Sequence, residues 1–320
     1  MDRRETREIC RKYNFRPSRR RGQNFLINDG ILEKIIETAD LGKDDLVLEV
    51  GSGLGFLTEE LAKRVKKVLA VEIDKELIKI LEEKLKNYPN VKILKEDILS
   101  KEMEEIISGW LPPRAKYKIV ANLPYNITSR FLRNFLSSKN NPIRSSAESY
   151  LLKSHQANPP YGLELSKSQN LLKTSNGARP ESMVLMVQKE VGKRIVAKPP
   201  LMSKLSVMVQ FYSQPKIIFL VKKANFWPRP KVESVILKIS EIKRRLNVNE
   251  ENFFEMVRAG FLSPRKYLLN NLEKGEIIKK EEEKKIFKKI GLSLKIRAQE
   301  LSVEDWEKLY ASLLGIKEHN

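Results

Sequence analysis

Residues 122–125, Asn-Leu-Pro-Tyr, directly follow a short apolar run and have types that suit the amine of a purine base. Such an amine is a poor nucleophile because its lone pair is delocalised into the ring. If the Asn122 side-chain oxygen and the Leu123 carbonyl both accept its N–H bonds, the nitrogen can pyramidalise and attack an electrophilic methyl group. Pro124 has a restricted φ and no N–H donor, which holds that carbonyl in place, and Tyr125 offers a flat stacking surface for an extruded base.

Scarce residue types agree with this chemistry. The chain contains two histidines, His155 and His319, and one cysteine, Cys10, which excludes a multi-histidine metal site, a thiolate cluster and an internal disulfide. Methyl transfer to an amine needs no strong general base, because the ammonium product loses its proton readily. We therefore expect the chemistry to come from a cofactor, carboxylates and backbone groups, with no metal.

Residues 158–161, Asn-Pro-Pro-Tyr, form a second tetrapeptide of the same kind. The residues before it, Ser-His-Gln-Ala, form no apolar strand that would fix Asn158 against a cofactor. We therefore expect Asn122 to be the functional residue, and segment 158–161 to be a proline-rich turn.

A glycine-rich segment contains Gly51, Gly53 and Gly55 and follows the apolar run at 46–50, a predicted buried strand. Glycines let the backbone turn tightly and approach a ligand, and the start of the next helix offers free N–H groups. The spacing G-x-G-x-G is one residue tighter than the dinucleotide fingerprint, and no basic residue stands in it to hold a pyrophosphate. The segment therefore favours a ligand with little or no phosphate.

Carboxylates stand at the ends of the next two predicted strands. Glu72, beside Ile73 and 21 residues after Gly51, can accept hydrogen bonds from both hydroxyls of a ribose. Asp97 can accept a bond from an adenine amine, with the Ile98 backbone meeting the ring; alternatively, Asp97 caps the following turn. Because ligands of open α/β sheets bind at this edge, the pattern indicates a nucleoside, and S-adenosylmethionine fits better than NAD.

Two further segments have residue types suited to a ligand. Residues 22–26 include Gln23, Asn24 and Leu26, where a lid over the cofactor could begin, or they form a helix-entry loop. Residues 226–234 form a rigid, aromatic and basic loop, in which Phe226 could stack on the target base with Lys231 near phosphate. The alternative for this loop is a structural turn with Phe226 in the core.

Strands and helices are predicted to alternate from about residue 30. Short apolar runs typical of strands stand at 46–50, 68–73, 91–94, 118–121, 183–187, 205–209, 217–221 and 235–239, and helical spacing separates the first three. This alternation predicts an α/β fold with a mostly parallel sheet covered on both faces. From about 241 the spacing is helical, which predicts a small all-helical C-terminal domain.

Composition predicts four segments. Residues 1–21 are rich in arginine and are predicted to form a mobile basic arm, ahead of an α/β domain over 22–240 and a helical domain over 241–320. Residues 137–179 are rich in Ser and Asn and are predicted to be an inserted, disordered loop within the α/β domain.

The formal charge of +20 indicates a polyanionic partner such as RNA. The sequence has no apolar run of the ~18 residues that a membrane span needs, and the acidic residues near its start argue against a signal peptide, so we expect no membrane association. A single cysteine fits a reducing, cytoplasmic compartment.

As a set, these motifs resemble the family of small-subunit ribosomal RNA adenine dimethyltransferases. The resemblance covers about 20–136 and 180–315 and rests on GQNFL, EVGSGLG, VEID, EDIL, NLPY, FWPRPKVES and RAQELS. It implies a Rossmann-like class I methyltransferase domain that transfers two methyl groups from S-adenosylmethionine to N6 of each of two adjacent adenosines near the 3′ end of small-subunit rRNA. It also implies that the helical domain docks on the assembling small subunit, and we expect a monomer.

The resemblance also implies roles for individual residues. Contacts to the target adenine are expected from Asn122, Leu123, Pro124, Tyr125 and Phe226. Contacts to S-adenosylmethionine are expected from Gln23, Asn24, Leu26, Gly51, Gly53, Gly55, Glu72, Ile73, Asp97, Ile98 and Asn122.

Two alternatives differ in target or in activity. A macrolide-resistance type methylase of large-subunit rRNA shares the cofactor and NLPY-like motifs, but FWPRPKVES and RAQELS favour the small-subunit family. An assembly factor without methyl transfer would not require Glu72, Asp97 and the NLPY segment together.

Overall fold

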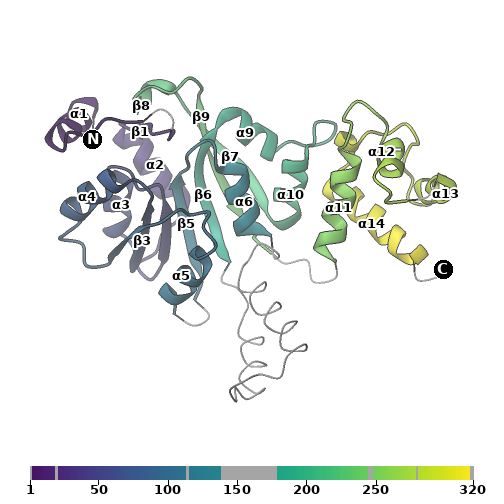
Figure 1. The fold of residues 1–320 in the computed structure, drawn as a ribbon, viewed down its shortest axis with the longest axis horizontal. Helices are drawn as coiled ribbons and strands as arrows, with labels where there is room; N and C mark the ends of the chain where they lie inside the picture. The colour runs from purple at the N-terminus through teal and green to yellow at the C-terminus, as the bar shows by residue number, and fades with distance from the viewer. Residues whose placement is uncertain are drawn as a thin grey trace, which may run out of the picture. The chain divides into compact units, whose positions relative to one another are not determined.

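The computed structural model describes residues 2–18, 21–112, 115–137, 179–243, 248–278 and 280–317. The chain divides into two compact units, shown in Figure 1. The first, here the α/β unit, comprises Met1–Gly192 and Lys216–Ile242, and the second, here the helical unit, comprises Lys193–Pro215 and Lys243–Asn320. The sequence analysis assigns all of 22–240 to the α/β domain. The structure differs at 193–215, which belongs to the helical unit.

A seven-stranded sheet forms the centre of the α/β unit, in the order β4-β3-β2-β5-β6-β9-β7. The pairs from β4 to β6 are parallel and β6 pairs with β9 antiparallel, which confirms the predicted mostly parallel α/β fold. The strands are β2 (Leu46–Val50), β3 (Lys67–Glu72), β4 (Val91–Lys95), β5 (Tyr117–Asn122), β6 (Pro180–Gln188), β7 (Gln214–Val221) and β9 (Ser234–Ser240).

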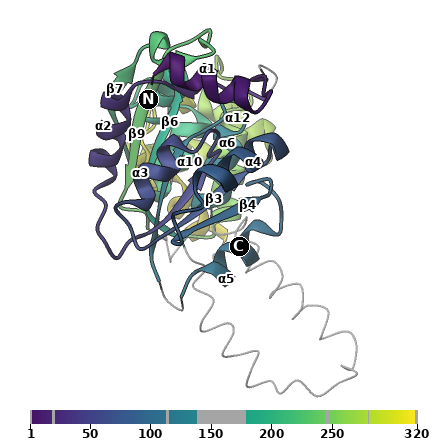
Figure 2. The same ribbon diagram turned by 90° about the vertical axis from the view of Figure 1, so that its left-hand side faces the viewer.

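Helices cover the centre of the sheet because its inner strands are apolar on both faces. All five residues of β2 are buried, as expected for a strand with neighbours above and below. Its Val47 belongs to a core cluster with Leu32 and Ile35 of α2 (Asp29–Ala39) and Leu61 of α3 (Phe56–Ala62), so these helices cover one face (Figure 2). Further helices of the unit are α4 (Lys75–Lys84), α5 (Met103–Trp110) and α6 (Thr128–Leu136), and α9 (Lys189–Ile195) begins in this unit and ends in the helical unit.

Parallel pairing brings the carboxyl ends of β2, β3, β4 and β5 to one edge of the sheet. Val50 pairs with Val71 on one side and with Ala121 on the other, and Glu72 pairs with Lys95. The loops that follow these four strands therefore meet at that edge, which is where ligands of open α/β sheets bind.

The N-terminal segment forms a packed helix, so the prediction of a mobile arm is wrong. Helix α1 (Arg3–Lys12) is capped by the Asp2 side chain, which accepts from the N–H groups of Arg4 and Glu5 at 2.7 and 2.8 Å. Cys10 is buried in a cluster with Phe15, Phe25, Leu54, Leu77 and Ile80. The arginines on the exposed face dominate the composition of this segment and conceal its apolar face.

A short second sheet joins the N-terminal segment to the aromatic loop. Strand β1 (Phe25–Leu26) pairs antiparallel with β8 (Phe226–Trp227), and Figure 1 shows α1 beside both. The 3-10 helix η1 (Lys223–Asn225) leads into β8.

The helical unit is built around buried aromatic rings. Phe211 stacks on Phe253 with ring centroids 4.5 Å apart, and Trp306 is fully buried. The first helix that lies wholly in the unit is α10 (Lys204–Tyr212). In the described ranges 248–278 and 280–317, the regular elements are α11 (Glu250–Gly260), α12 (Leu268–Lys274), α13 (Lys280–Lys289), the 3-10 helix η2 (Ala298–Glu300) and α14 (Val303–Lys317).

The prediction of a strand at 205–209 is wrong, because these residues lie in helix α10 (Lys204–Tyr212). A capping box between Ser203 and Ser206 starts the helix. Leu205, Val207 and Val209 are all buried, so the helix shows no polar face, and a short apolar run of this kind does not distinguish a strand from a helix.

Nearly all of the predicted insertion at 137–179 lies outside the described residues, and so do Asn158, His155 and His319. Across the described ranges, every helix is too short or too polar to cross a membrane.

Candidate active site

A cavity of about 480 Å³ lies at the carboxyl ends of β2, β3, β4 and β5. It brings together Glu72, Asp97 and Asn122, which the sequence places at three different strand ends. The predicted site residues that line it are Gln23, Asn24, Leu26, Gly51, Gly53, Glu72, Ile73, Asp97, Ile98, Asn122, Leu123, Pro124 and Tyr125. Gly55 and Phe226 do not line it.

The glycine-rich loop after β2 needs glycine at both Gly53 and Gly55. Gly53 has φ +58°, and a Cβ there would lie 3.1 Å from the Phe25 ring, so the loop can pass close to β1 only without a side chain. Gly55 has φ +76°, and a Cβ would lie 2.8 Å from Leu81 on α4. Gly55 therefore serves helix packing, which differs from its predicted place at the cofactor.

Glu72 is buried at the end of β3 and is held by three backbone donors. Gly53 N–H donates to Oε2 at 2.9 Å, and the N–H groups of Ile73 and Asp74 donate to Oε1 at 2.9 and 3.0 Å. Burial raises the pKa of this carboxyl, and the three N–H bonds oppose that rise. A carboxylate can accept about four hydrogen bonds, so Oε2 keeps an open acceptor position for a ligand hydroxyl.

Asp97 both caps a turn and lines the cavity, so the two sequence interpretations are compatible. Its Oδ1 accepts the Leu99 N–H at 2.9 Å. Ile73 is 58% exposed, which is unusual for a large apolar side chain, whereas Ile98 is buried. The two isoleucines give this end of the cavity an apolar lining beside the carboxylates of Glu96 and Asp97, which suits a purine ring with an amine.

Asn122 is oriented by the segment before β1. Its Nδ2 donates to the Asn24 carbonyl oxygen at 3.2 Å, and a carbonyl partner requires the amide nitrogen on that side. The Asn122 Oδ1 is therefore the acceptor that remains for a ligand. Leu123 N–H donates to the Met186 carbonyl at 3.2 Å, which fixes the following peptide to β6.

Tyr125 is tethered at its hydroxyl. The hydroxyl lies 2.7 Å from Ser234 Oγ, and burial raises the pKa of Tyr125, opposed by this hydrogen bond. Ser234 is the last residue of the aromatic loop, so the loop positions the ring that borders the cavity.

Phe226 does not reach the cavity, and the expectation that it borders the target base is not met in this structure. It is 3% exposed and packs in the core cluster that contains Leu26, Val221 and Ile236. Its pairing with Leu26 in the two-stranded sheet directs the ring inward, as the alternative interpretation of this loop expects.

Glu49 is a cavity residue that the sequence reasoning missed. It is fully enclosed in β2, and its Oε2 accepts from Ser52 Oγ at 3.0 Å. Burial raises the pKa of Glu49 to about 7, and the neighbouring Glu72 adds to the rise. The signal in the sequence is a glutamate inside an otherwise apolar strand, Leu-Val-Leu-Glu-Val.

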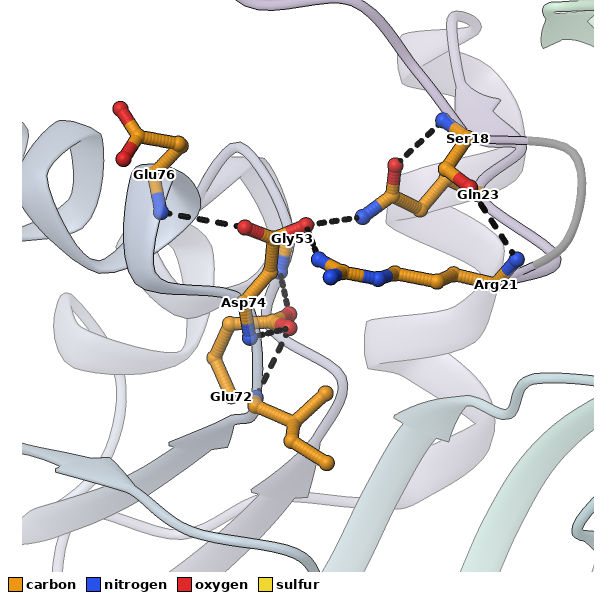
Figure 3. A network of polar contacts seen from close by, with 8 residues as sticks. Ser18, Arg21, Gln23, Gly53, Glu72, Asp74 and Glu76 are labelled. Atoms are coloured by element: carbon orange, nitrogen blue, oxygen red, sulfur yellow. Dashed lines mark hydrogen bonds and ion pairs between the residues drawn. The ribbon is translucent and has the colours of Figure 1, made fainter.

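Arg21 and Asp74 form a second group that was missed, shown in Figure 3. Asp74 accepts from the Arg21 guanidinium, from Gln23 Nε2 at 2.8 Å and from the Glu76 N–H at 3.0 Å. Burial raises the pKa of Asp74, but these three donors outweigh burial and leave it below the ordinary value. Gln23 also accepts the Ser18 N–H at 2.6 Å. Its amide therefore binds the Ser18 backbone through the oxygen and Asp74 through the nitrogen.

The fold and this site define a Rossmann-like class I methyltransferase, and solved structures show the same fold. The 23S rRNA methyltransferase ErmE matches with a TM-score of 0.63 and 24% identity, over 91% of this chain and 99% of that one. A dimethyladenosine transferase from Plasmodium falciparum matches with a TM-score of 0.64 and 22% identity, over 92% of this chain and 98% of that one.

The chain belongs to the ribosomal RNA adenine dimethylase family, whose model matches residues 14–314. It is 39% identical over 313 residues to ribosomal RNA small subunit methyltransferase A of Dehalococcoides mccartyi, covering 97% of this chain and 93% of the relative. The protein of that name from Clostridium botulinum is 35% identical, covering 95% of this chain and 96% of the relative. Membership makes the chain an rRNA adenine methyltransferase and implies S-adenosylmethionine as the methyl donor.

The cavity residues fit that donor. Gly51 and Gly53 turn the backbone at positive φ where it lines the cavity, Glu72 offers an acceptor for a ribose hydroxyl, and the Ile73 and Asp97 end suits an adenine. Among the described residues, no three His, Cys, Asp or Glu side chains are grouped so as to hold a metal ion.

Proposed function

We propose that this chain dimethylates N6 of two adjacent adenosines near the 3′ end of small-subunit rRNA, with the assembling small subunit as its substrate. It acts as a monomer in the cytoplasm. The target adenine is flipped out of the RNA and enters the cavity beside residues 122–125.

The orientation of the Asn122 amide supports this proposal most directly. Because Nδ2 is engaged by the Asn24 carbonyl, Oδ1 is presented as an acceptor for an amine N–H. With the Leu123 carbonyl as a second acceptor, the amine nitrogen loses its planarity and its lone pair becomes available. Tyr125 provides a stacking surface whose hydroxyl is tied to Ser234.

The other cavity residues hold the donor. S-adenosylmethionine, when bound, supplies the electrophilic methyl group. Glu72 accepts a ribose hydroxyl, Asp97 accepts the N–H of the donor's own adenine, and Ile73 and Ile98 enclose that ring. Gly51 and Gly53, both at positive φ, turn the backbone along the side of the cavity where the donor would lie.

The choice of small-subunit rRNA rests on the relatives. The chain is 39% identical to a protein named for the small subunit, whereas the likeness to the 23S rRNA enzyme, at 24% identity, shows the fold alone. Large-subunit rRNA is therefore the second candidate target, and an assembly role without methyl transfer is the third.

The proposal is tested with unmethylated small subunits and labelled S-adenosylmethionine, followed by primer extension to locate the modified bases. Asn122→Ala is expected to lower transfer by about a hundredfold or more, because the amine loses one of its two acceptors. Asn87→Ala, an exposed asparagine beyond the end of α4, is the matched control and should retain full activity.

Other outcomes select other functions. Label confined to large-subunit RNA would select the second candidate target. Binding of S-adenosylmethionine without any transfer to either subunit would select the assembly role.

A further inference from the structure

Asp74 occupies a position that the proposed reaction does not explain. Its side chain is 7% exposed, and it accepts hydrogen bonds from two side chains of the N-terminal segment, Arg21 and Gln23 (Figure 3). Both donors use Oδ2, whereas the Glu76 N–H at the start of α4 uses Oδ1. One carboxylate oxygen thus accepts from the helix that Asp74 caps, and the other accepts from the N-terminal segment that borders the cavity.

The same residue is linked to both halves of the site. Its backbone N–H donates to Glu72 Oε1 at 3.0 Å, on the side of the cavity where a ribose is expected. Gln23, which it holds, is followed by Asn24, whose carbonyl oxygen accepts the Asn122 amide at 3.2 Å. A continuous set of contacts therefore runs from Glu72 through Asp74 to the asparagine that faces the target amine.

We propose that Asp74 is a positioning residue that holds segment 21–24 against the cofactor cavity and so sets the affinity for S-adenosylmethionine. This inference rests on the proposed function, because it assigns the residue to that same cofactor site. The positioning depends on the negative charge at Oδ2, since a charge-assisted bond to a guanidinium is stronger than a neutral one.

A purely structural role of Asp74 predicts a different result. If Asp74 serves only as the cap of α4, its replacement lowers stability and leaves cofactor affinity unchanged. Asp74→Asn separates the two roles, because the asparagine oxygen can still accept the Glu76 N–H. Its amide nitrogen would then face two donors, Arg21 and Gln23, and could accept from neither.

The experiment measures the Kd for S-adenosylmethionine by calorimetry in the absence of RNA, together with KM for the cofactor, KM for small subunits and kcat. Asp74→Asn and Arg21→Gln are each expected to raise the cofactor Kd and KM about tenfold, the scale of one lost charge-assisted bond. KM for small subunits should stay within about twofold. Arg21→Lys should recover part of the affinity, because it restores the positive charge without the planar fork.

A double variant and a control complete the design. The double variant Arg21→Gln with Asp74→Asn should bind S-adenosylmethionine no more weakly than Asp74→Asn alone, because both changes remove the same contact. Lys12→Gln is the matched control: it removes the ion pair of Lys12 with Glu83 at 2.6 Å, which joins the N-terminal segment to α4 outside the cavity lining. It should leave the cofactor Kd unchanged.

The results separate this inference from the function on which it rests. An unchanged cofactor Kd in a folded Asp74→Asn protein, with only the unfolding temperature lowered, would overturn the positioning role and leave the function standing. Failure of the unaltered chain to bind S-adenosylmethionine would overturn the proposed function and this inference with it.

Discussion

At the scale of single residues, the site depends on polar groups whose orientation is fixed by backbone partners. Glu72 is fixed by three N–H donors, and Asn122 by one carbonyl oxygen. These contacts form on folding and do not have to be made when a ligand arrives. Such preorganisation is the main way in which an enzyme with little acid–base chemistry can accelerate a reaction.

Glu49 provides a residue-scale prediction about pH. Burial raises its pKa from 4.5 to about 7, so the folded state binds this proton more tightly than the unfolded chain does. Its contribution to stability is then fully present below about pH 4.5 and is lost as the pH rises through about 7. Glu49→Gln should therefore stabilise the protein above pH 7 by up to about 3 kcal/mol and make little difference near pH 4.5.

The measurement is urea denaturation of both proteins between pH 4.5 and 8.5, with buffers of constant ionic strength. Glu33→Gln on the exposed face of α2 is the control and should not change the profile. A stabilisation of equal size at every pH would contradict the raised pKa of Glu49.

At the scale of elements, the N-terminal helix is part of the folded α/β unit. Phe15, just after α1, is 8% exposed and lies 6.2 Å from Phe25 between ring centroids. Phe15→Ala should lower the free energy of unfolding by about 3 kcal/mol, because it leaves a cavity in a cluster shared with α4. Chemical denaturation measures this change.

Arg16→Ala is the neighbouring control, since Arg16 is exposed. It should change stability by less than about 0.5 kcal/mol. Equal, negligible effects of the two substitutions would mean that residues 2–18 behave as a free arm.

At the scale of the whole molecule, the net charge of +20 governs encounter with RNA. Binding to small-subunit RNA should weaken by about three orders of magnitude or more between 50 and 200 mM salt if about six phosphates are contacted. Filter binding across a salt series measures the slope. Binding of S-adenosylmethionine to the same protein should change far less, and a flat RNA profile would contradict the role of the basic surface.

The sequence by itself determined the alternation of strands and helices, the edge at which the ligand residues gather and the identity of most of them. It could do so because apolar periodicity reports burial and because parallel strands bring their carboxyl ends together. Glu72, Asp97 and Asn122 stand at the carboxyl ends of three such strands, so local pattern was sufficient to place them at one edge.

Only the tertiary structure decided which side chains reach the cavity and which face the core. Phe226 turns inward because β8 pairs with a strand about 200 residues earlier, and α1 packs because α4 offers it an apolar surface. The contact of Asp74 with Arg21 joins residues 53 positions apart. Contacts of this kind depend on long-range packing, which has no periodicity that a local segment of sequence can show.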